Sequence, residues 1–258
     1  MESNLKEHLK VQKINIDERM SKIGKKIAVG SGKGGVGKSV VTSLIASYLA
    51  KQGKTVGILD LDITGPSIPM MFGIDEKPIG GSSGIIPVVS KSGIKIMSMS
   101  LFLPNNEDAV IWRGLRISGA VSQFLSDVLW EDIDYLLFDL PPGTSDVQLT
   151  LMQSIKLDGF VVVTSPQILA STIVKKAVSM AEELNVKVLG VVENMAYASC
   201  PTCGKKIDLF GNGENSKMGL PEIGSIPVDP EISRLCDDGK IENYQIDLDK
   251  IYQIIENI

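Results

Sequence analysis

The sequence predicts an α/β fold in which helices cover both faces of a mostly parallel β-sheet. Apolar runs of strand length alternate along the chain with segments whose apolar residues recur at helical spacing. The strand-length runs are continuously apolar, which is typical of parallel sheets that are buried on both faces. Hydrophobic residues make up 43% of the 258 residues, enough for the substantial core that such a fold needs.

The apolar runs that we interpret as strands are followed, in several cases, by helical segments. The expected strands are 26–30, 54–62, 93–100, 134–143, 159–166 and 186–194, with a last short strand at 224–230. The expected helices are 39–52, 115–129, 170–184 and a terminal helix at 248–258. Residues 77–93 are rich in Gly, Ser and Pro, which favours a loop or a hairpin. Ligands of open α/β sheets bind at the carboxyl ends of the strands.

One large domain is expected over residues 25–258, preceded by a polar arm over residues 1–24 that lacks hydrophobic periodicity and is expected to be mobile. The net charge of −5 argues against partners such as nucleic acid or an anionic membrane. No apolar stretch has the length of a signal-peptide core or a membrane span, so we expect a cytoplasmic protein. Its three cysteines are then expected to serve metal binding or redox chemistry rather than a structural disulfide.

The stretch "AVGSGKGGVGKSVVTS" contains the phosphate-binding pattern G-x-x-x-x-G-K-[ST], between a predicted strand and a predicted helix. Its glycines let successive backbone N–H groups face one anion, and the helix N-terminus adds partial positive charge. Lys38 is expected to reach the β- and γ-phosphates, and the Ser39 hydroxyl to coordinate Mg²⁺. The expected nucleotide-binding residues of this loop are Gly32, Lys33, Gly34, Gly35, Val36, Gly37, Lys38, Ser39 and Val40.

Lys33 is a second lysine that the phosphate-binding pattern does not require. A cation at this place can stabilise the charge that develops during γ-phosphate transfer, as an arginine finger does. If two subunits met face to face, Lys33 of one subunit would reach the nucleotide of the other. The alternative is a solvated lysine on an exposed turn, and the spacing alone does not decide between the two.

Carboxylates and one amide follow three further predicted strands. Asp60 and Asp62 share one side of an extended chain, so one can contact Mg²⁺ or its waters while the other orients the attacking water. The alternative is that the two carboxylates cap the next turn. Asp139 ends an apolar run and can hold Mg²⁺ through water, and the Gly143 N–H beyond it can sense the γ-phosphate. Asn194 carries a donor and an acceptor that match adenine.

Cys200 and Cys203 form a C-x-x-C pair within an irregular stretch at about 196–220. Two thiolates at this spacing bind one metal ion or cluster, or form a redox pair. Structural zinc and a [4Fe–4S] cluster each take four ligands, and a two-fold dimer would supply four thiolates from one repeated surface. Zinc and iron both remain open on this reasoning. The third cysteine, Cys236, is interpreted as a small packing residue.

The segment "GKGGVGKS" resembles the deviant Walker A loop of dimeric ATPases that include nitrogenase iron protein, MinD and ParA. The resemblance implies a SIMIBI-type P-loop NTPase in which Lys33 acts across the dimer interface and is catalytic together with Lys38. It favours Asp62 both as the residue that orients the attacking water and as a magnesium ligand. The motifs "DLDITGPSIP", "WRG", "DLPPGTSD", "VENMAY", "CPTCG" and "IPVDP" follow in the order of the Mrp/Nbp35/ApbC family of iron–sulfur cluster carrier ATPases.

That second resemblance covers roughly residues 25–234 and implies a homodimer that uses ATP and Mg²⁺. It implies a [4Fe–4S] cluster bridged by Cys200 and Cys203 of two subunits and passed to apo-proteins, with zinc as an alternative metal in purified protein. It also implies that Asn194 contacts adenine, with Pro227 and Asp229 flanking the base. The competing hypotheses are a MinD/ParA-like positioning ATPase that acts on a membrane or DNA, and an ATPase with structural zinc at the dimer interface.

Overall fold

The computed structural model describes residues 2–62, 65–102, 114–166, 170–200, 202–209 and 219–258. Its centre is an eight-stranded sheet in the order β12-β9-β8-β1-β7-β2-β6-β5. All neighbouring strands in it are parallel except β5 and β6. The strands are β1 (Ile23–Ser31), β2 (Val56–Asp60), β5 (Val88–Val89), β6 (Lys95–Ser98), β7 (Ile133–Asp139), β8 (Gly159–Thr164), β9 (Val188–Glu193) and β12 (Glu222–Ser225). The predicted mostly parallel sheet is confirmed.

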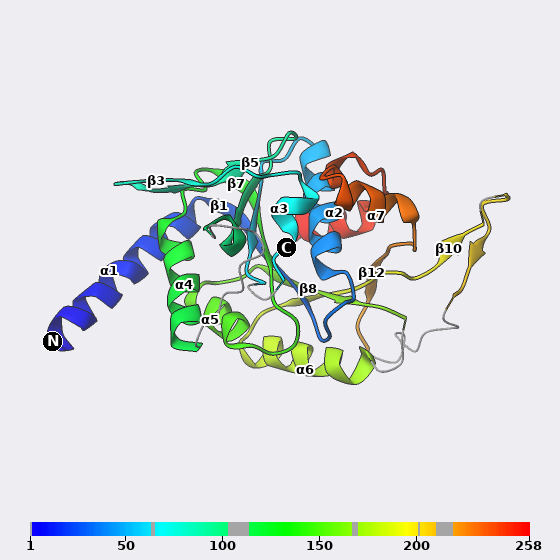
Figure 1. Ribbon diagram of the computed structural model, residues 1–258. Coiled ribbons are helices and arrows are strands. Elements are labelled where there is room, and N and C mark those ends of the chain that lie inside the picture. The colour runs from blue at the N-terminus through cyan, green and yellow to red at the C-terminus, as the bar shows by residue number, and fades with distance from the viewer. Residues whose placement is uncertain (1, 63–64, 103–113, 167–169, 201, 210–218) are drawn as a thin grey trace.

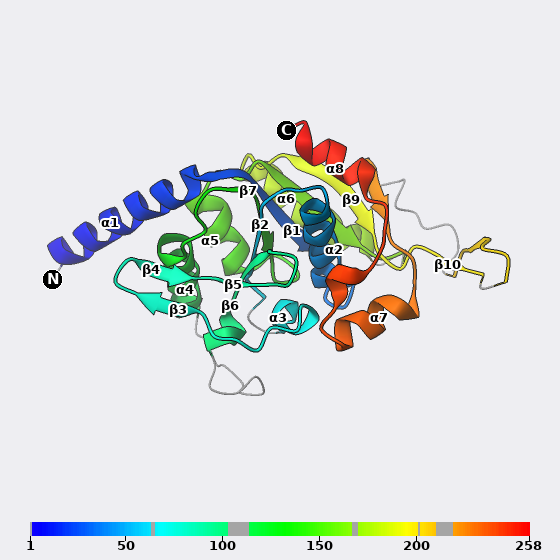
Figure 2. The ribbon, with the colours of Figure 1, turned by 90° about the horizontal axis from the view of Figure 1, so that it is seen from above.

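Helices cover both faces of this sheet, as predicted (Figures 1 and 2). Along β1, Ala28 packs into one core cluster while Ile27 and Val29 pack into the other, which explains why the strand is continuously apolar. The first cluster draws on α1 (Glu2–Ser21), α4 (Gly114–Asp127), α5 (Asp146–Ser154) and α6 (Ala170–Glu183). The second draws on α2 (Lys38–Lys51), α3 (Ile68–Met71), α7 (Pro230–Asp237) and α8 (Asp249–Glu256).

The amino-terminal arm forms the helix α1, which the sequence analysis did not predict. Its carboxyl-terminal half packs against α4 and buries Ile16 and Met20, and the Arg19 guanidinium donates a hydrogen bond of 2.9 Å to the Ser83 carbonyl. Its amino-terminal half projects from the body (Figure 2). The expectation of a mobile arm is therefore wrong for the packed half. The division between residues 1–24 and 25–258 stays a prediction.

Two short hairpins stand outside the main sheet. Strands β3 (Ile79–Gly81) and β4 (Gly84–Ile86) form the hairpin expected within residues 77–93. Strands β10 (Ala198–Ser199) and β11 (Lys206–Ile207) form a second hairpin, which projects from the body at the end opposite α1 (Figure 1). Two 3-10 turns, Met99–Phe102 and Ile241–Asn243, complete the described elements.

The carboxyl-terminal helix α8 forms where the sequence predicts it. Its apolar side packs into the core, and Leu248, Ile251 and Ile255 are all at most 3% exposed. Within the described parts of the chain, no helix combines the length and apolarity needed to cross a membrane.

Candidate nucleotide site and cysteine hairpin

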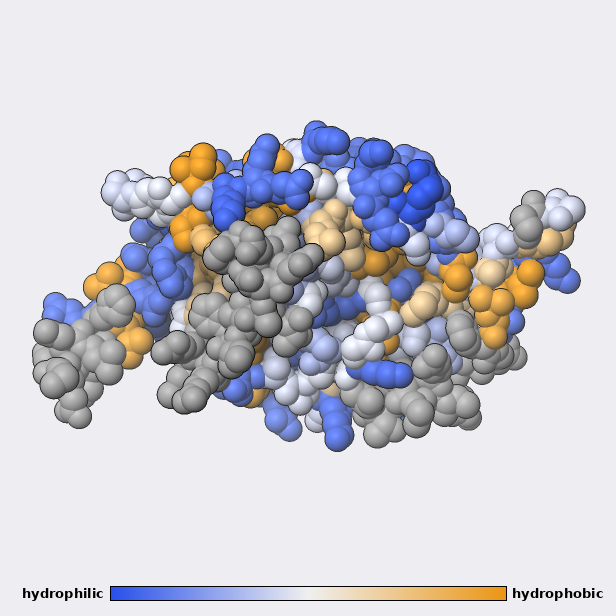
Figure 3. All heavy atoms as spheres, viewed as in Figure 1, coloured by the Kyte–Doolittle hydropathy of each residue, from blue (hydrophilic) through white to orange (hydrophobic). Residues whose placement is uncertain are grey.

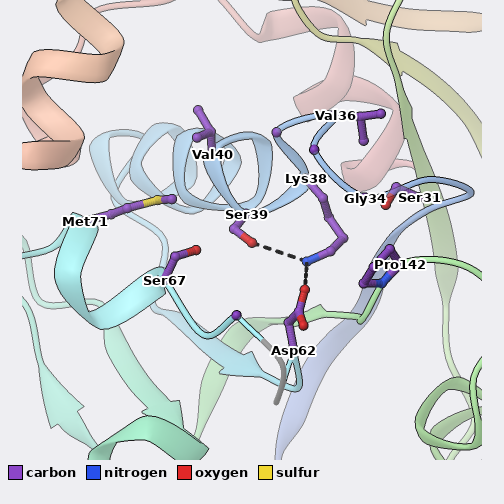
Figure 4. A pocket seen from close by; sticks show the side chains of 13 residues that line it. Ser31, Gly34, Val36, Lys38, Ser39, Val40, Asp62, Ser67, Met71 and Pro142 are labelled. Carbon is purple, nitrogen blue, oxygen red and sulfur yellow. Dashed lines mark hydrogen bonds and ion pairs between the residues drawn. The ribbon is translucent and has the colours of Figure 1, made fainter. Parts of the chain in front are cut away.

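The phosphate loop lies where the central strand β1 gives way to α2, at the carboxyl edge of the sheet. Gly35 and Gly37 have φ angles of 80° and 78°, in the left-handed region that favours glycine. A cavity of about 230 Å³ opens over the loop (Figure 4). It is lined by Ser31, Gly34, Gly35, Val36, Gly37, Lys38, Ser39, Val40, Asp62, Gly65, Ser67, Met71 and Pro142.

Most of the predicted loop residues therefore line this cavity. Gly32 and Lys33 do not, although they belong to the same loop. The Lys33 side chain is exposed, while its carbonyl accepts a hydrogen bond of 3.1 Å from the Ser31 hydroxyl. The backbone of the loop is thus held by β1, and the Lys33 ammonium faces solvent, where a second molecule can reach it.

Asp139, at the end of β7, lies at the centre of the site and is fully buried. One of its oxygens, Oδ2, accepts hydrogen bonds from Lys38 Nζ at 2.7 Å and from the Ser39 hydroxyl at 2.6 Å. The other, Oδ1, accepts one of 2.6 Å from Thr42. Thr42 was not predicted as a site residue, although its place one turn after Lys38 puts it on the same face of α2.

The first carboxylate loop follows β2 and contributes Asp62 to the cavity. Lys38 Nζ lies 3.7 Å from Asp62 Oδ2 (Figure 4). With Asp139 at 2.7 Å, the lysine sits between two carboxylates. Asp60 is buried instead, and it accepts a hydrogen bond of 3.1 Å from the Asp62 N–H and another of 3.1 Å from the Ser98 hydroxyl. Burial, followed by the nearby Asp139 charge, raises the pKa of Asp60. Asp60 therefore orders the loop that presents Asp62.

The second carboxylate loop follows β7 and contributes Pro142 to the cavity. Gly143 has a φ angle of 79°, and its N–H donates a hydrogen bond of 2.9 Å to the Ser31 carbonyl. In this structure the Gly143 N–H is thus used to join the loop to β1. The Gln148 side chain, which the sequence analysis did not single out, donates a hydrogen bond of 2.6 Å to the Pro141 carbonyl from α5.

The residues expected around adenine are only partly brought together. Asn194 reaches the phosphate loop, where its Nδ2 donates a hydrogen bond of 2.9 Å to the Val36 carbonyl. Asp229 instead caps α7 by accepting a hydrogen bond of 2.9 Å from the Glu231 N–H, and it accepts another of 2.8 Å from the Tyr244 hydroxyl. Neither Asp229 nor Pro227 lines the cavity, and their contact with a base stays a prediction.

The cysteine pair lies at the tip of the β10–β11 hairpin. Cys200 is half-buried and Cys203 is exposed. Backbone bonds close the turn: the Cys200 N–H donates to the Lys205 carbonyl at 2.9 Å, and the Gly204 N–H donates to the Cys200 carbonyl at 2.8 Å. Hydrogen bonds from the backbone N–H groups of Cys203 and then Thr202 lower the pKa of the Cys200 thiol, because they stabilise its thiolate.

No group of three or more His, Cys, Asp and Glu side chains suited to a metal ion occurs among the residues that the structure describes. Cys236 is half-buried against the core, and burial raises its pKa, in agreement with its interpretation as a packing residue. Residues 201 and 210–218 of the expected cysteine loop, and residues 63–64 and 112–113 of the quoted motifs, lie outside the described residues.

The glycine-rich loop joins a central parallel strand to a helix, and a carboxylate from the neighbouring strand holds its lysine and serine. This arrangement defines a P-loop nucleoside triphosphatase. Within that class, the chain belongs to the NUBPL iron-transfer P-loop NTPase family, whose model, ParA, matches residues 22–258.

Relatives with high sequence identity carry one common name, iron–sulfur cluster carrier protein. The relative from Methanocaldococcus jannaschii is 48% identical over 240 residues, which cover 91% of this chain and 83% of the relative. The relative from Clostridium perfringens is 47% identical over 230 residues, which cover 84% of this chain and 81% of the relative.

Solved structures agree with the fold. A nucleotide-binding protein from Archaeoglobus fulgidus in complex with ADP matches with a TM-score of 0.81 and 46% identity, covering 92% of this chain and 95% of that one. The cell division ATPase MinD from Pyrococcus furiosus matches with a TM-score of 0.66 and 20% identity, covering 90% of this chain and 97% of that one. The second likeness concerns the fold alone.

Proposed function

We propose that this chain is a homodimeric, ATP-hydrolysing iron–sulfur cluster carrier that binds a [4Fe–4S] cluster between two subunits and transfers it to apo-proteins. The observation that carries the proposal is the C-x-x-C pair at the tip of a projecting hairpin on a P-loop NTPase. The common name of its relatives supports the cargo, and the ADP complex of the Archaeoglobus fulgidus protein supports an adenine nucleotide.

The nucleotide half of the proposal uses the cavity over the phosphate loop. The donor set suits magnesium, because Ser39 and Asp62 offer the oxygen atoms that Mg²⁺ prefers, and the Lys38 ammonium already occupies a cation's place beside Asp62. When bound, Mg²⁺ neutralises phosphate charge. Lys38 turns from the carboxylates to the phosphates, and Asp62 orients the attacking water.

Lys33 is the residue that makes catalysis depend on a second subunit. Its ammonium is exposed and lies outside the lining of its own cavity, so it is available to the nucleotide of a partner. A cation delivered at the γ-phosphate stabilises the charge that builds up there during transfer. Hydrolysis then requires the dimer.

The cysteine half of the proposal needs the same dimer. A cubane cluster takes four thiolates, and each chain brings Cys200 and Cys203. Apolar side chains exposed near the hairpin, where Figure 3 shows orange surface, offer area for contact between subunits: Ile207, Leu209 and Val228 are 45%, 49% and 38% exposed. The exposed Cys203 thiol leaves the cluster site open to a recipient protein, which favours transfer. We expect this chemistry in the reducing cytoplasm.

The positioning-ATPase alternative is less well supported. An amphipathic helix binds a membrane through a free apolar face. In α8 that face, formed by Leu248, Ile251 and Ile255, is packed into the core. Structural zinc at the dimer interface remains the second candidate function, because four thiolates bind zinc as well as iron.

Anaerobic reconstitution with iron and sulfide tests the proposal. The wild-type dimer is expected to gain about four iron atoms, as a cubane cluster requires. The Cys200→Ala/Cys203→Ala variant is expected to gain none, whereas Cys236→Ala, a matched control on the half-buried packing cysteine, behaves as wild type. Equal iron in wild type and the double variant would refute the cluster site. Zinc without iron in anaerobically purified protein would favour the second candidate.

A further inference from the structure

We propose that Asn194 is a positioning residue of the phosphate loop. Its side-chain amide holds the peptide between Val36 and Gly37 so that the Gly37 N–H faces the nucleotide cavity. The inference rests on the proposed nucleotide-binding function and deepens it, because it gives Asn194 a role toward the phosphates rather than toward the base.

The contact is well anchored at both ends. Asn194 Nδ2 donates to the Val36 carbonyl at 2.9 Å, and the Asn194 residue is only 6% exposed, so little water competes for this bond. The Asn194 backbone N–H donates to the Thr164 carbonyl at 2.8 Å, at the end of β8. The amide therefore ties a glycine-rich loop to the rigid edge of the sheet.

The orientation of the peptide follows from its planarity. In a trans peptide the C=O and the following N–H point in opposite directions. Fixing the Val36 carbonyl on Asn194 therefore turns the Gly37 N–H away from Asn194, toward the cavity that Gly37 lines. Gly37 precedes α2, so this N–H belongs to the end of the helix dipole where anions bind.

A glycine-rich loop needs such a support, because glycine allows its peptides to adopt several orientations at little cost. A loop that is ordered before the ligand arrives binds more tightly, since the ordering entropy is not lost on binding. The fit at Gly37 is a second, independent observation: a Cβ at this position would lie 2.1 Å from Asn194 Nδ2. The amide packs directly against the glycine whose N–H it directs.

Binding of Mg-ATP and of inorganic triphosphate, compared by calorimetry in wild type and Asn194→Ala, separates this role from a base contact. Loss of one buried hydrogen bond corresponds to about tenfold in affinity. We expect about tenfold weaker binding of both ligands, because triphosphate has no base. A loss confined to ATP, or no loss, would overturn the proposal. A wild-type protein that bound neither ligand would refute the proposed nucleotide function instead.

A double-mutant cycle in unfolding gives a readout that needs no ligand. Gly37→Ala introduces the clash with Asn194 Nδ2, and Asn194→Ala removes the atom that is struck. We therefore expect Gly37→Ala to lower the unfolding midpoint less in the Asn194→Ala background than in wild type. Strictly additive changes would show that the two residues do not touch, and would overturn the proposal even if the nucleotide function held.

Discussion

Replacing Gly239 with alanine tests how α7 is joined to α3, beside the nucleotide cavity. Gly239 ends α7 and Gly73 follows α3, and the two backbones meet directly. A Cβ at residue 239 would lie 2.5 Å from Gly73 Cα, 2.7 Å from Gly73 N and 3.2 Å from the Met70 carbonyl oxygen. Backbone atoms cannot swing aside as a side chain does, so the two helices must separate.

The expected loss of unfolding free energy in Gly239→Ala has two contributions. Gly239 has a φ angle of 66°, and a left-handed alanine costs about 1 kcal/mol. Overpacking against fixed atoms costs a further ~2 kcal/mol. Gly53 is the matched control, because its φ angle of 78° brings the same strain while a Cβ there meets nothing within 4 Å.

Chemical denaturation of both variants measures the difference. Gly239→Ala is expected to lose about 3 kcal/mol of unfolding free energy and Gly53→Ala about 1 kcal/mol. In thermal unfolding the gap of ~2 kcal/mol corresponds to about 4–8 °C. Because Met71 of α3 lines the cavity, Gly239→Ala is also expected to weaken ATP binding. Equal losses in the two variants would refute the argument that the helices touch through their backbones.

Three further outcomes are expected. The Asp139→Asn variant should lose about 3 kcal/mol of unfolding free energy, because the substitution breaks a buried charge pair. The Asp238→Asn variant, which breaks an ion pair on the surface, should lose under about 1 kcal/mol. Lys33→Ala should lower ATP turnover about a thousandfold and leave ATP binding intact; turnover within tenfold of wild type would contradict a role in trans. A hydrogen bond to Asp249 raises the pKa of Tyr48 to about 12 from 10.0. The hydrogen bond between Tyr48 and Asp249 therefore stabilises the folded protein fully below pH 10, and this stabilisation is lost toward pH 12. The melting temperatures of wild type and Tyr48→Phe should converge over that range.

The sequence predicted those features that depend on local patterns. Continuous apolar runs predicted the parallel strands, and the spacing of Gly32, Gly37 and Lys38 predicted the phosphate loop at the end of β1. Asp62 and Asp139 were expected at strand ends, and the sheet order brings them together, because β2 and β7 are neighbours.

Features that depend on distant partners were not predictable in this way. Among the α1 side chains that the structure describes, only Ile16 and Met20 are buried apolar residues, too few for a clear helical period in a charged segment. The contact between Asn194 and Val36 joins residues 158 positions apart, and no local spacing indicates it. Asp229 was assigned by resemblance alone, and the structure uses its carboxylate to cap α7.

The position of Lys38 between Asp139 and Asp62 affects how much negative charge a ligand needs in order to bind. Before any nucleotide arrives, the ammonium is already neutralised by carboxylates, so an incoming anion must outcompete them for the same cation. The attraction to the ammonium grows with the charge of the anion, so a nucleoside monophosphate competes less well for Lys38 than a chain of two or three phosphates. Discrimination against nucleoside monophosphates would then arise from competition inside the protein, without any group that recognises phosphate number.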